Sequence, residues 1–282
     1  MRLVRTTREF QGLVSHGCIF VPTMGALHVG HAALIREAVL LRARERSSLP
    51  VIVSIFVNPT QFNEESDLAR YPRTLESDSR LCGECGADAV YVPDESEVYP
   101  PETRILVPTL PYVATSPRLE DATRPGHFAG VCQVVARLFE LVRAHVALFG
   151  EKDWQQFKVI EAMVASSPEL RLRPRVVGVP TVREADGLAM SSRNVFLTPA
   201  DRSKALAISR SLHDALSAKS VSTAEQSMSD RLSHAGLHVE YAVVRDAQTL
   251  LPFIGNGPHN GRALIAARVG SVRLIDNTAW PG

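Results

Sequence analysis

Two histidines stand three residues apart in the stretch VPTMGALHVGH, residues 21–31, and both could donate hydrogen bonds to an anion. Gly25 and Gly30 allow a backbone to approach a ligand closely, and the apolar spacing that follows is helical. His28 and His31 are therefore expected where a helix begins, an end that favours phosphate. A zinc site needs a further ligand, and the H-E-x-x-H spacing is absent. In the structural alternative, one histidine caps the helix and the other lies on the surface.

A second set of anion-binding groups stands in MSSRN, residues 190–194. Ser191 and Ser192 can donate to phosphate oxygens, and the Arg193 guanidinium can bind a phosphate through two parallel hydrogen bonds. Lys152 follows an apolar run and a glycine, where its ammonium could meet phosphate as a point charge. In the structural alternative for MSSRN, the segment is a turn whose Arg193 forms a salt bridge. In the alternative for Lys152, the residue is a solvated loop lysine.

Side-chain amides complete the candidate groups. Gln61 follows a turn signalled by Asn58-Pro59 and could bind a hydroxyl or a carboxylate, or only cap the next helix. Asp153 and Gln156 have the spacing of a capping box, which explains both structurally. The sequence shows neither a Ser-His-Asp order nor a phosphate-binding P-loop. It indicates a site for a nucleoside-triphosphate-like anion, without a covalent nucleophile.

These residues follow predicted strands that alternate with helices. Buried strands are expected at 18–22, 51–57, 89–92, 146–150 and 172–180. Helices are expected at 31–46, within 71–88, at 127–143 and at 153–165, with an irregular connection at 93–126. This order predicts a parallel sheet, and such sheets bind ligands at the carboxyl ends of their strands.

The pattern changes near residue 180. Thr198 as N-cap, Pro199 at the first helical position and Asp201 at the third predict a helix start. A second helix and three alternating strands at 238–246, 262–269 and 271–277 follow. We therefore expect an α/β domain over residues 1–178 and a smaller α+β domain over residues 179–282.

Composition limits the possible partners. The 282 residues carry a formal net charge of +1, with 45% hydrophobic and 22% charged residues. A nucleic-acid binder usually has a basic excess, so that partner is not expected. Charges interrupt the first 20 residues, and no apolar run is long enough to span a bilayer. We expect a cytoplasmic protein without a membrane partner.

The stretch CGEC places Cys82 and Cys85 at a spacing known from zinc and redox sites. No second pair and no nearby histidine complete a set of four ligands. The two cysteines would share one face of a helix, which favours buried thiols.

Seven segments together resemble the pantoate–β-alanine ligase family, in the family's order and over nearly the whole chain. The segments are VPTMGALHVGH, SIFVNPTQF, YPRTLESD, RPGHFAGV, LFGEKDWQQF, GVPTVREADGLAMSSRN and VRLIDN. The H-x-G-H element also marks the wider nucleotidyltransferase superfamily, which includes class I aminoacyl-tRNA synthetases. This chain has Val29 where the family often has an acidic residue, and AMSSRN lacks the lysines of the synthetase signature.

The resemblance implies a Rossmann-like N-terminal domain and a smaller C-terminal domain that covers it, usually in a homodimer. The implied reaction uses ATP and Mg²⁺: pantoate attacks the α-phosphate to give pantoyl adenylate and pyrophosphate, and β-alanine then releases AMP and forms pantothenate. A polyphosphate repels an approaching carboxylate, so positive charge and positioning supply the catalysis.

The resemblance also implies roles for individual residues. The catalytic residues would be His28, His31, Lys152 and Arg193. ATP would be bound by these four together with Met24, Gly150, Asp153, Met190, Ser191 and Ser192. Pantoate would be bound by Pro22, Met24, Asn58, Gln61 and Gln156. Magnesium would be held chiefly by ATP, with Asp78 as a candidate behind it, while Arg124 and His127 lie near the pocket without an assigned role.

Three other functions stay open at this point. Nucleotide transfer without amide formation would keep the ATP chemistry and change the acceptor. A non-enzymatic binding module would show decay of the catalytic cluster, yet the histidines, Lys152 and SSRN are intact. A tRNA-binding protein is disfavoured by the near-neutral charge.

Overall fold

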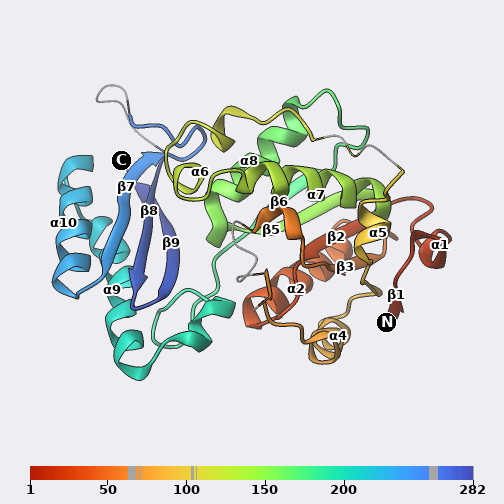
Figure 1. The fold of residues 1–282 in the computed structure, drawn as a ribbon, viewed down its shortest axis with the longest axis horizontal. Helices are drawn as coiled ribbons and strands as arrows, with labels where there is room; N and C mark the ends of the chain where they lie inside the picture. The colour runs from red at the N-terminus through yellow and green to blue at the C-terminus, as the bar shows by residue number, and fades with distance from the viewer. Residues whose placement is uncertain (63–67, 70, 103–104, 106, 254–259, 282) are drawn as a thin grey trace. The chain divides into compact units, whose positions relative to one another are not determined.

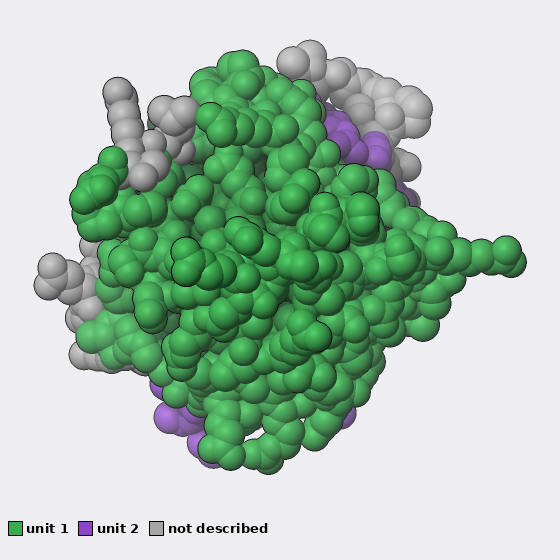
Figure 2. Space-filling model, turned by 90° about the vertical axis from the view of Figure 1, so that its right-hand side faces the viewer, with its two compact units in different colours: residues 1–151, 155–180 green, residues 152–154, 181–282 purple. Residues whose placement is uncertain are grey.

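The computed structural model describes residues 1–62, 68–69, 71–102, 105, 107–253 and 260–281. It divides into two compact units, which Figure 2 colours separately. The first unit comprises residues 1–151 and 155–180, and the second comprises residues 152–154 and 181–282. The first unit thus ends at Pro180. Residues 152–154 belong to the second unit, although the residues on either side of them in the chain belong to the first.

The first unit is built on a parallel six-stranded sheet, as the alternation of strands and helices predicted (Figure 1). The order is β1-β4-β3-β2-β5-β6. The strands are β1 (Arg2–Val4), β2 (Cys18–Thr23), β3 (Val51–Ile55), β4 (Ala89–Tyr91), β5 (Ala144–Gly150) and β6 (Arg175–Val179). Strand order reverses between β2 and β5, and α/β sheets bind ligands at such a switch point. Pro22 and Gly150 stand at the carboxyl ends of these two strands.

Side chains alternate between the two faces of this sheet, because successive residues of a strand point to opposite sides. Ile19 and Val21 belong to one core cluster with α2 (Val29–Arg44) and α4 (Leu75–Glu84). Phe20 points the other way and meets Phe139 of α7 (His127–Val142) edge to face, with ring centroids 6.3 Å apart. On the same side, Phe157 of α8 (Trp154–Ser166) packs at Gly178 of β6.

Several short or shifted elements differ from the sequence prediction. Strand β1 was not predicted, since its three residues carry an arginine and lie at the sheet edge beside β4. The described part of the connection at 93–126 contains two single-turn α-helices, α5 (Glu95–Val98) and α6 (Glu120–Thr123), and the 3₁₀ turn η2 (Tyr112–Ala114). Residues 103–104 and 106 lie outside the described residues. Helix α1 (Thr7–Phe10) was also not predicted. Helix α2 begins two residues earlier than expected, at Val29, because a histidine serves as its N-cap.

The second unit is α+β, as predicted. Strands β7 (His238–Asp246), β8 (Asn260–Val269) and β9 (Val272–Pro281) form an antiparallel sheet in the order β7-β8-β9. Helices α9 (Pro199–Ala215) and α10 (Val221–His234) share one apolar core with it. Helix α9 starts as the sequence indicated: the Asp201 amide donates to Thr198 Oγ1 at 3.1 Å.

The four cysteines are buried and form no disulfide, which confirms the prediction of buried thiols. Burial, together with the nearby Asp78 carboxylate, raises the pKa of Cys82 to about 12. The thiol is therefore protonated at neutral pH, and a protonated thiol is a poor nucleophile. Among the described residues, no helix combines the length and apolar character needed to cross a membrane.

Candidate functional site

The two histidines together cap helix α2. The Gly30 amide donates to Nδ1 of His28 at 3.1 Å, and the His28 amide donates to Nδ1 of His31 at 3.2 Å. This is a capping box in which imidazoles take both side-chain positions. The ring centroids lie 4.1 Å apart. The structural alternative of one capping and one surface histidine therefore does not describe the pair.

The caps fix the tautomer of both rings. A backbone N–H can only donate, so Nδ1 of His28 and Nδ1 of His31 must be unprotonated acceptors. Each neutral ring then carries its proton on Nε2, which is the atom that can donate to a phosphate oxygen. Capping alone does not require histidine, since Asn, Asp and Ser are the residues that usually cap helices.

A buried carboxylate shapes the turn that leads into this helix. Gly25 and Ala26 both have a positive φ, +84° and +50°, a conformation that is costly for alanine. Asp78, only 2% exposed, accepts the Ala26 amide at 2.9 Å and the Leu27 amide at 2.8 Å. The Thr74 hydroxyl donates to the same carboxylate at 3.0 Å. Gly25 therefore makes room for Asp78, whose oxygen would lie 3.1 Å from an added Cβ.

Three of the predicted pantoate-binding residues contact one another around the 3₁₀ turn η1 (Pro59–Gln61). Asn58, 1% exposed, donates through Nδ2 to Oε1 of Gln61 at 3.3 Å. Nε2 of Gln61 donates to the sulfur of Met24. Met24, Asn58 and Gln61 thus form one contact chain that links η1 to the segment after β2.

The start of helix α7 holds this turn from behind. His127, 6% exposed, makes a 3.1 Å hydrogen bond through Nδ1 to the Gln61 carbonyl. Arg124 lies 3.0 Å from Nε2 of the same ring. Guanidinium groups only donate, so Nε2 accepts and Nδ1 carries the proton. A Cβ on Gly130 would lie 2.5 Å from the Thr60 carbonyl oxygen. The RPGHFAGV segment therefore positions η1, a role that sequence reasoning could not assign.

Adjacent glutamines on α8 have different environments. Gln155 is buried and fully engaged: its Oε1 accepts the Glu120 amide at 2.9 Å, and its Nε2 donates to the Val113 carbonyl at 2.8 Å. Gln156, the residue that the resemblance assigns to pantoate, is half-buried. Gly150 has no packing requirement for glycine, because an added Cβ would meet nothing within 4 Å.

In the second unit, Lys152 and Asp153 belong to the turn η3 (Glu151–Asp153). Nζ of Lys152 lies 3.6 Å from Oδ1 of Asp153, and the lysine side chain is 18% exposed. The Lys152 carbonyl accepts the Asn277 side-chain amide at 2.7 Å. The indole of Trp154 donates to the Ala247 carbonyl at 3.1 Å. The backbone that carries Lys152 is thus anchored to the unit's own sheet and adjoining turn, and the lysine is not a freely solvated loop residue.

The loop with the two serines has its own ion pairs. Arg183 binds Asp276 at 2.6 Å, and Arg202 binds Glu184 at 2.5 Å. Arg193 is exposed, and among the described residues no carboxylate lies within 4.0 Å of its guanidinium. The alternative of an Arg193 salt bridge is therefore not what the described residues show.

Ser191 and Met190 have local roles as well. Ser191 caps the turn η4 (Ser192–Phe196) by accepting the Arg193 amide at 3.3 Å. The Met190 amide donates to the Val182 carbonyl at 2.9 Å. The side chains of Met190, Ser191 and Ser192 are half-buried, so a turn and a ligand-binding role are compatible for them.

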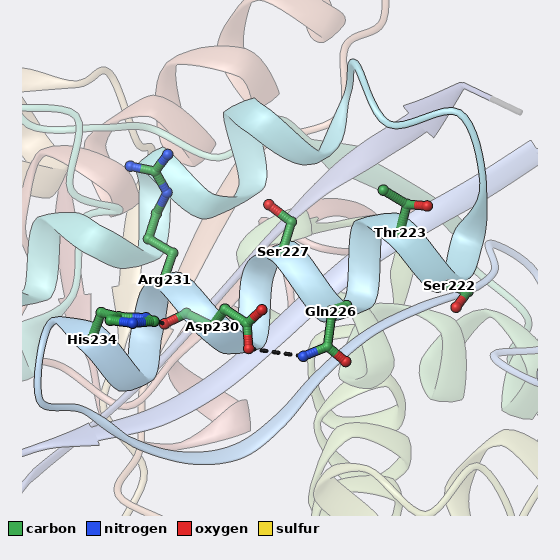
Figure 3. A pocket seen from close by; sticks show the side chains of 7 residues that line it. All are labelled: Ser222, Thr223, Gln226, Ser227, Asp230, Arg231 and His234. Carbon is green, nitrogen blue, oxygen red and sulfur yellow. Dashed lines mark hydrogen bonds between the residues drawn. The ribbon is translucent and has the colours of Figure 1, made fainter.

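A shallow pocket on α10 is lined by none of the candidate site residues (Figure 3). All of its lining residues lie on that one helix: Ser222, Thr223, Gln226, Ser227, Asp230, Arg231 and His234. Gln226 and Asp230 pair with each other at 2.8 Å, as the dashed line shows. The arrangement is that of a solvated polar helix face.

The chain is similar to known proteins over nearly its whole length. A family profile described as pantoate-beta-alanine ligase matches residues 2–279. The chain is 44% identical over 295 residues to a pantothenate synthetase of Rubrobacter xylanophilus, covering 99% of this chain and 98% of that protein. It is 46% identical over 274 residues to a pantothenate synthetase of Myxococcus xanthus, covering 95% and 90%.

Solved structures agree with these sequence relatives. A pantothenate synthetase of Thermus thermophilus superposes with a TM-score of 0.89 at 41% identity, covering 100% of both chains. A pantoate-beta-alanine ligase of Francisella tularensis, complexed with beta-gamma ATP and beta-alanine, superposes with a TM-score of 0.77 at 31% identity, covering 99% and 97%.

Proposed function

Because the chain belongs to the pantoate–β-alanine ligase family, we propose that it condenses pantoate with β-alanine at the expense of ATP. The products are pantothenate, AMP and pyrophosphate, and pantoyl adenylate is the intermediate. One observation within the chain carries this proposal. A helix that begins at the switch point of a parallel sheet is capped by two imidazoles, both of which have Nε2 as the protonated atom.

In the first step, a carboxylate oxygen of pantoate attacks the α-phosphorus of ATP. The new bond is the phosphorus–oxygen bond of the adenylate, and the bond to pyrophosphate breaks. Negative charge builds on the phosphate oxygens, where N–H donors from His28 and His31 stabilise it. Lys152 and Arg193 supply positive charge, which offsets the repulsion between two anions.

Magnesium is part of the proposal. The ion neutralises phosphate charge when it is bound. Among the described residues, no three His, Cys, Asp or Glu side chains gather as a metal site. We assign the ion to the phosphates of ATP, as is common for Mg²⁺. Asp78 already accepts three hydrogen bonds, and its expected place behind the ion stays a prediction.

In the second step, the amine of β-alanine attacks the acyl carbon of the adenylate. The amide bond forms, the acyl–oxygen bond breaks, AMP leaves, and the amine gives up a proton. Gln61 and Gln156 hold pantoate through their amides, while Pro22, Met24 and Asn58 shape its pocket. The proposal includes ATP contacts for Gly150, Asp153, Met190, Ser191 and Ser192.

Water must be kept from the acyl adenylate. The proposal gives residues 1–178 the binding of nucleotide and pantoate, and residues 179–282 the part of a lid. It also includes a homodimer and a cytoplasmic location. The alternative within the superfamily is nucleotide transfer without amide formation.

Product analysis separates the two reactions. The protein is incubated with Mg²⁺, ATP and pantoate, with and without β-alanine, and AMP and pantothenate are quantified by chromatography. The proposal predicts multiple turnovers of AMP only when β-alanine is present, with one pantothenate formed per AMP. Pyrophosphate release that is indifferent to β-alanine would instead support nucleotide transfer.

A further inference from the structure

Tyr99 follows α5 and has no role in the site as described so far. Its ring packs near Phe56, with centroids 6.2 Å apart. Its hydroxyl donates to Oδ1 of Asn58 at 2.9 Å. Burial raises the pKa of Tyr99 above its usual value of about 10, so the hydroxyl stays protonated at neutral pH. The hydroxyl of a half-buried tyrosine therefore donates to a residue of the pantoate-binding turn.

The Asn58 amide has one allowed orientation. Its Oδ1 accepts the Thr60 amide at 3.3 Å and the Tyr99 hydroxyl at 2.9 Å, while its Nδ2 donates to the Gly130 carbonyl at 3.2 Å. Exchanging oxygen and nitrogen would set N–H against the Thr60 N–H and place two oxygens together at Gly130. At 1% exposure no solvent could repair either mismatch.

The orientation of Asn58 sets that of Gln61. Nδ2 of Asn58 donates to Oε1 of Gln61 at 3.3 Å, so the oxygen end of the Gln61 amide is held. The nitrogen end lies on the other side, next to the Met24 sulfur. Gln61 thus presents N–H donors, which match the carboxylate and hydroxyl oxygens of a hydroxy acid.

We propose that Tyr99 is a positioning residue for the acid substrate: through Asn58 it fixes the Gln61 amide with its N–H groups toward that substrate. The inference rests on the proposed function, because pantoate is the acid it names. It adds that the group which Gln61 recognises is an acceptor oxygen, and that the hydroxyl of Tyr99 and not its ring carries the effect.

The test uses Tyr99→Phe, which keeps the ring and removes the hydroxyl. Losing one net hydrogen bond is expected to raise the KM for pantoate about three- to tenfold. The KM for ATP and the thermal unfolding midpoint should stay as in the wild type. The matched control is Tyr112→Phe, which removes the same atom from an exposed tyrosine (58%) and should change nothing.

A double-mutant cycle tests the route through Asn58. In an Asn58→Ala background, Tyr99→Phe should have no further effect on the pantoate KM. A full effect of Tyr99→Phe in that background would overturn the relay. An unchanged pantoate KM in Tyr99→Phe alone, or equal changes for pantoate and ATP, would overturn the positioning role.

A measurement without turnover keeps this inference separate from the proposed function. The side-chain NH₂ resonances of Gln61 in ¹⁵N-labelled protein should shift in Tyr99→Phe and stay in place in Tyr112→Phe. Unmoved resonances would overturn the inference even in an active enzyme. A wild type that makes no pantothenate would overturn the proposed function, whereas a shift of Gln61 would still support the positioning of its amide.

Discussion

The histidine pair permits a substitution that separates its two roles. His28→Asn places an amide oxygen near the position of Nδ1, where it can still accept the Gly30 amide. His31→Gln supplies the side chain that normally completes a capping box from the third helical position. The double variant therefore keeps the caps seen at 3.1 and 3.2 Å but lacks both Nε2–H donors of the imidazoles.

The expected magnitudes differ for stability and for catalysis. Asn and Gln are good capping residues, so the free energy of unfolding should stay within about 0.5 kcal/mol of the wild type. Replacing both histidines by alanine removes two caps of about 1 kcal/mol each, so that control should lose about 2 kcal/mol. Losing one donor to developing phosphate charge costs about 10²–10³ in kcat, so both variants should lose at least that.

The assay combines urea unfolding with the rate of AMP formation. The reasoning predicts two variants with similarly low activity and different stabilities. Activity of the Asn/Gln variant within tenfold of the wild type would refute the role of the Nε2–H groups. A loss of stability equal to that of the double alanine variant would refute the capping role.

Three further predictions follow from single contacts. Lys152→Ala should reduce the rate of AMP formation about 10²-fold with an unchanged unfolding midpoint. The control Lys204→Ala, at an exposed lysine, should leave that rate as in the wild type. Equal rates for the two variants would remove Lys152 from the catalytic groups. Gly130→Ala places a Cβ 2.5 Å from the Thr60 carbonyl oxygen. Thermal unfolding should therefore show a free energy of unfolding lower by about 1–3 kcal/mol, and the KM for pantoate should rise. A wild-type stability and a wild-type KM would show that Gly130 does not hold the turn. Asp78→Asn replaces one carboxylate oxygen by an N–H donor that faces a backbone N–H, of Ala26 or of Leu27. Urea unfolding should therefore show a loss of about 1–3 kcal/mol, and an unchanged midpoint would contradict the clamp.

Apolar periodicity and capping residues were enough to predict most of the longer helices and strands. The apolar runs at 51–57 and 146–150 became β3 and β5, and the Thr198 signals marked the start of α9. These elements are specified by periodicity and capping, which operate over a few residues. Strand β1 has three residues and no such signal, because its pairing with β4 comes from tertiary packing.

The sequence predicted which residues belong to the candidate site, but it predicted few of the hydrogen bonds that they make. The spacing of His28 and His31 suggested a helix N-terminus, but only the backbone shows that both rings accept from it. The clamp on the preceding turn comes from Asp78, more than 50 residues away in the chain. Tyr99 stands in a segment without periodicity, and its contact with Asn58 depends on the packing of that segment. Such long-range pairs leave no mark in a single sequence.

The measurement that tests the central claim most directly is pantoate-dependent exchange of labelled pyrophosphate into ATP, with Mg²⁺ and without β-alanine. Reversible formation of pantoyl adenylate predicts exchange that requires pantoate and is lost in the Asn/Gln double variant of His28 and His31. Exchange that proceeds equally without pantoate, or no exchange together with no AMP when β-alanine is added, would contradict the assignment of pantoate as the activated acid.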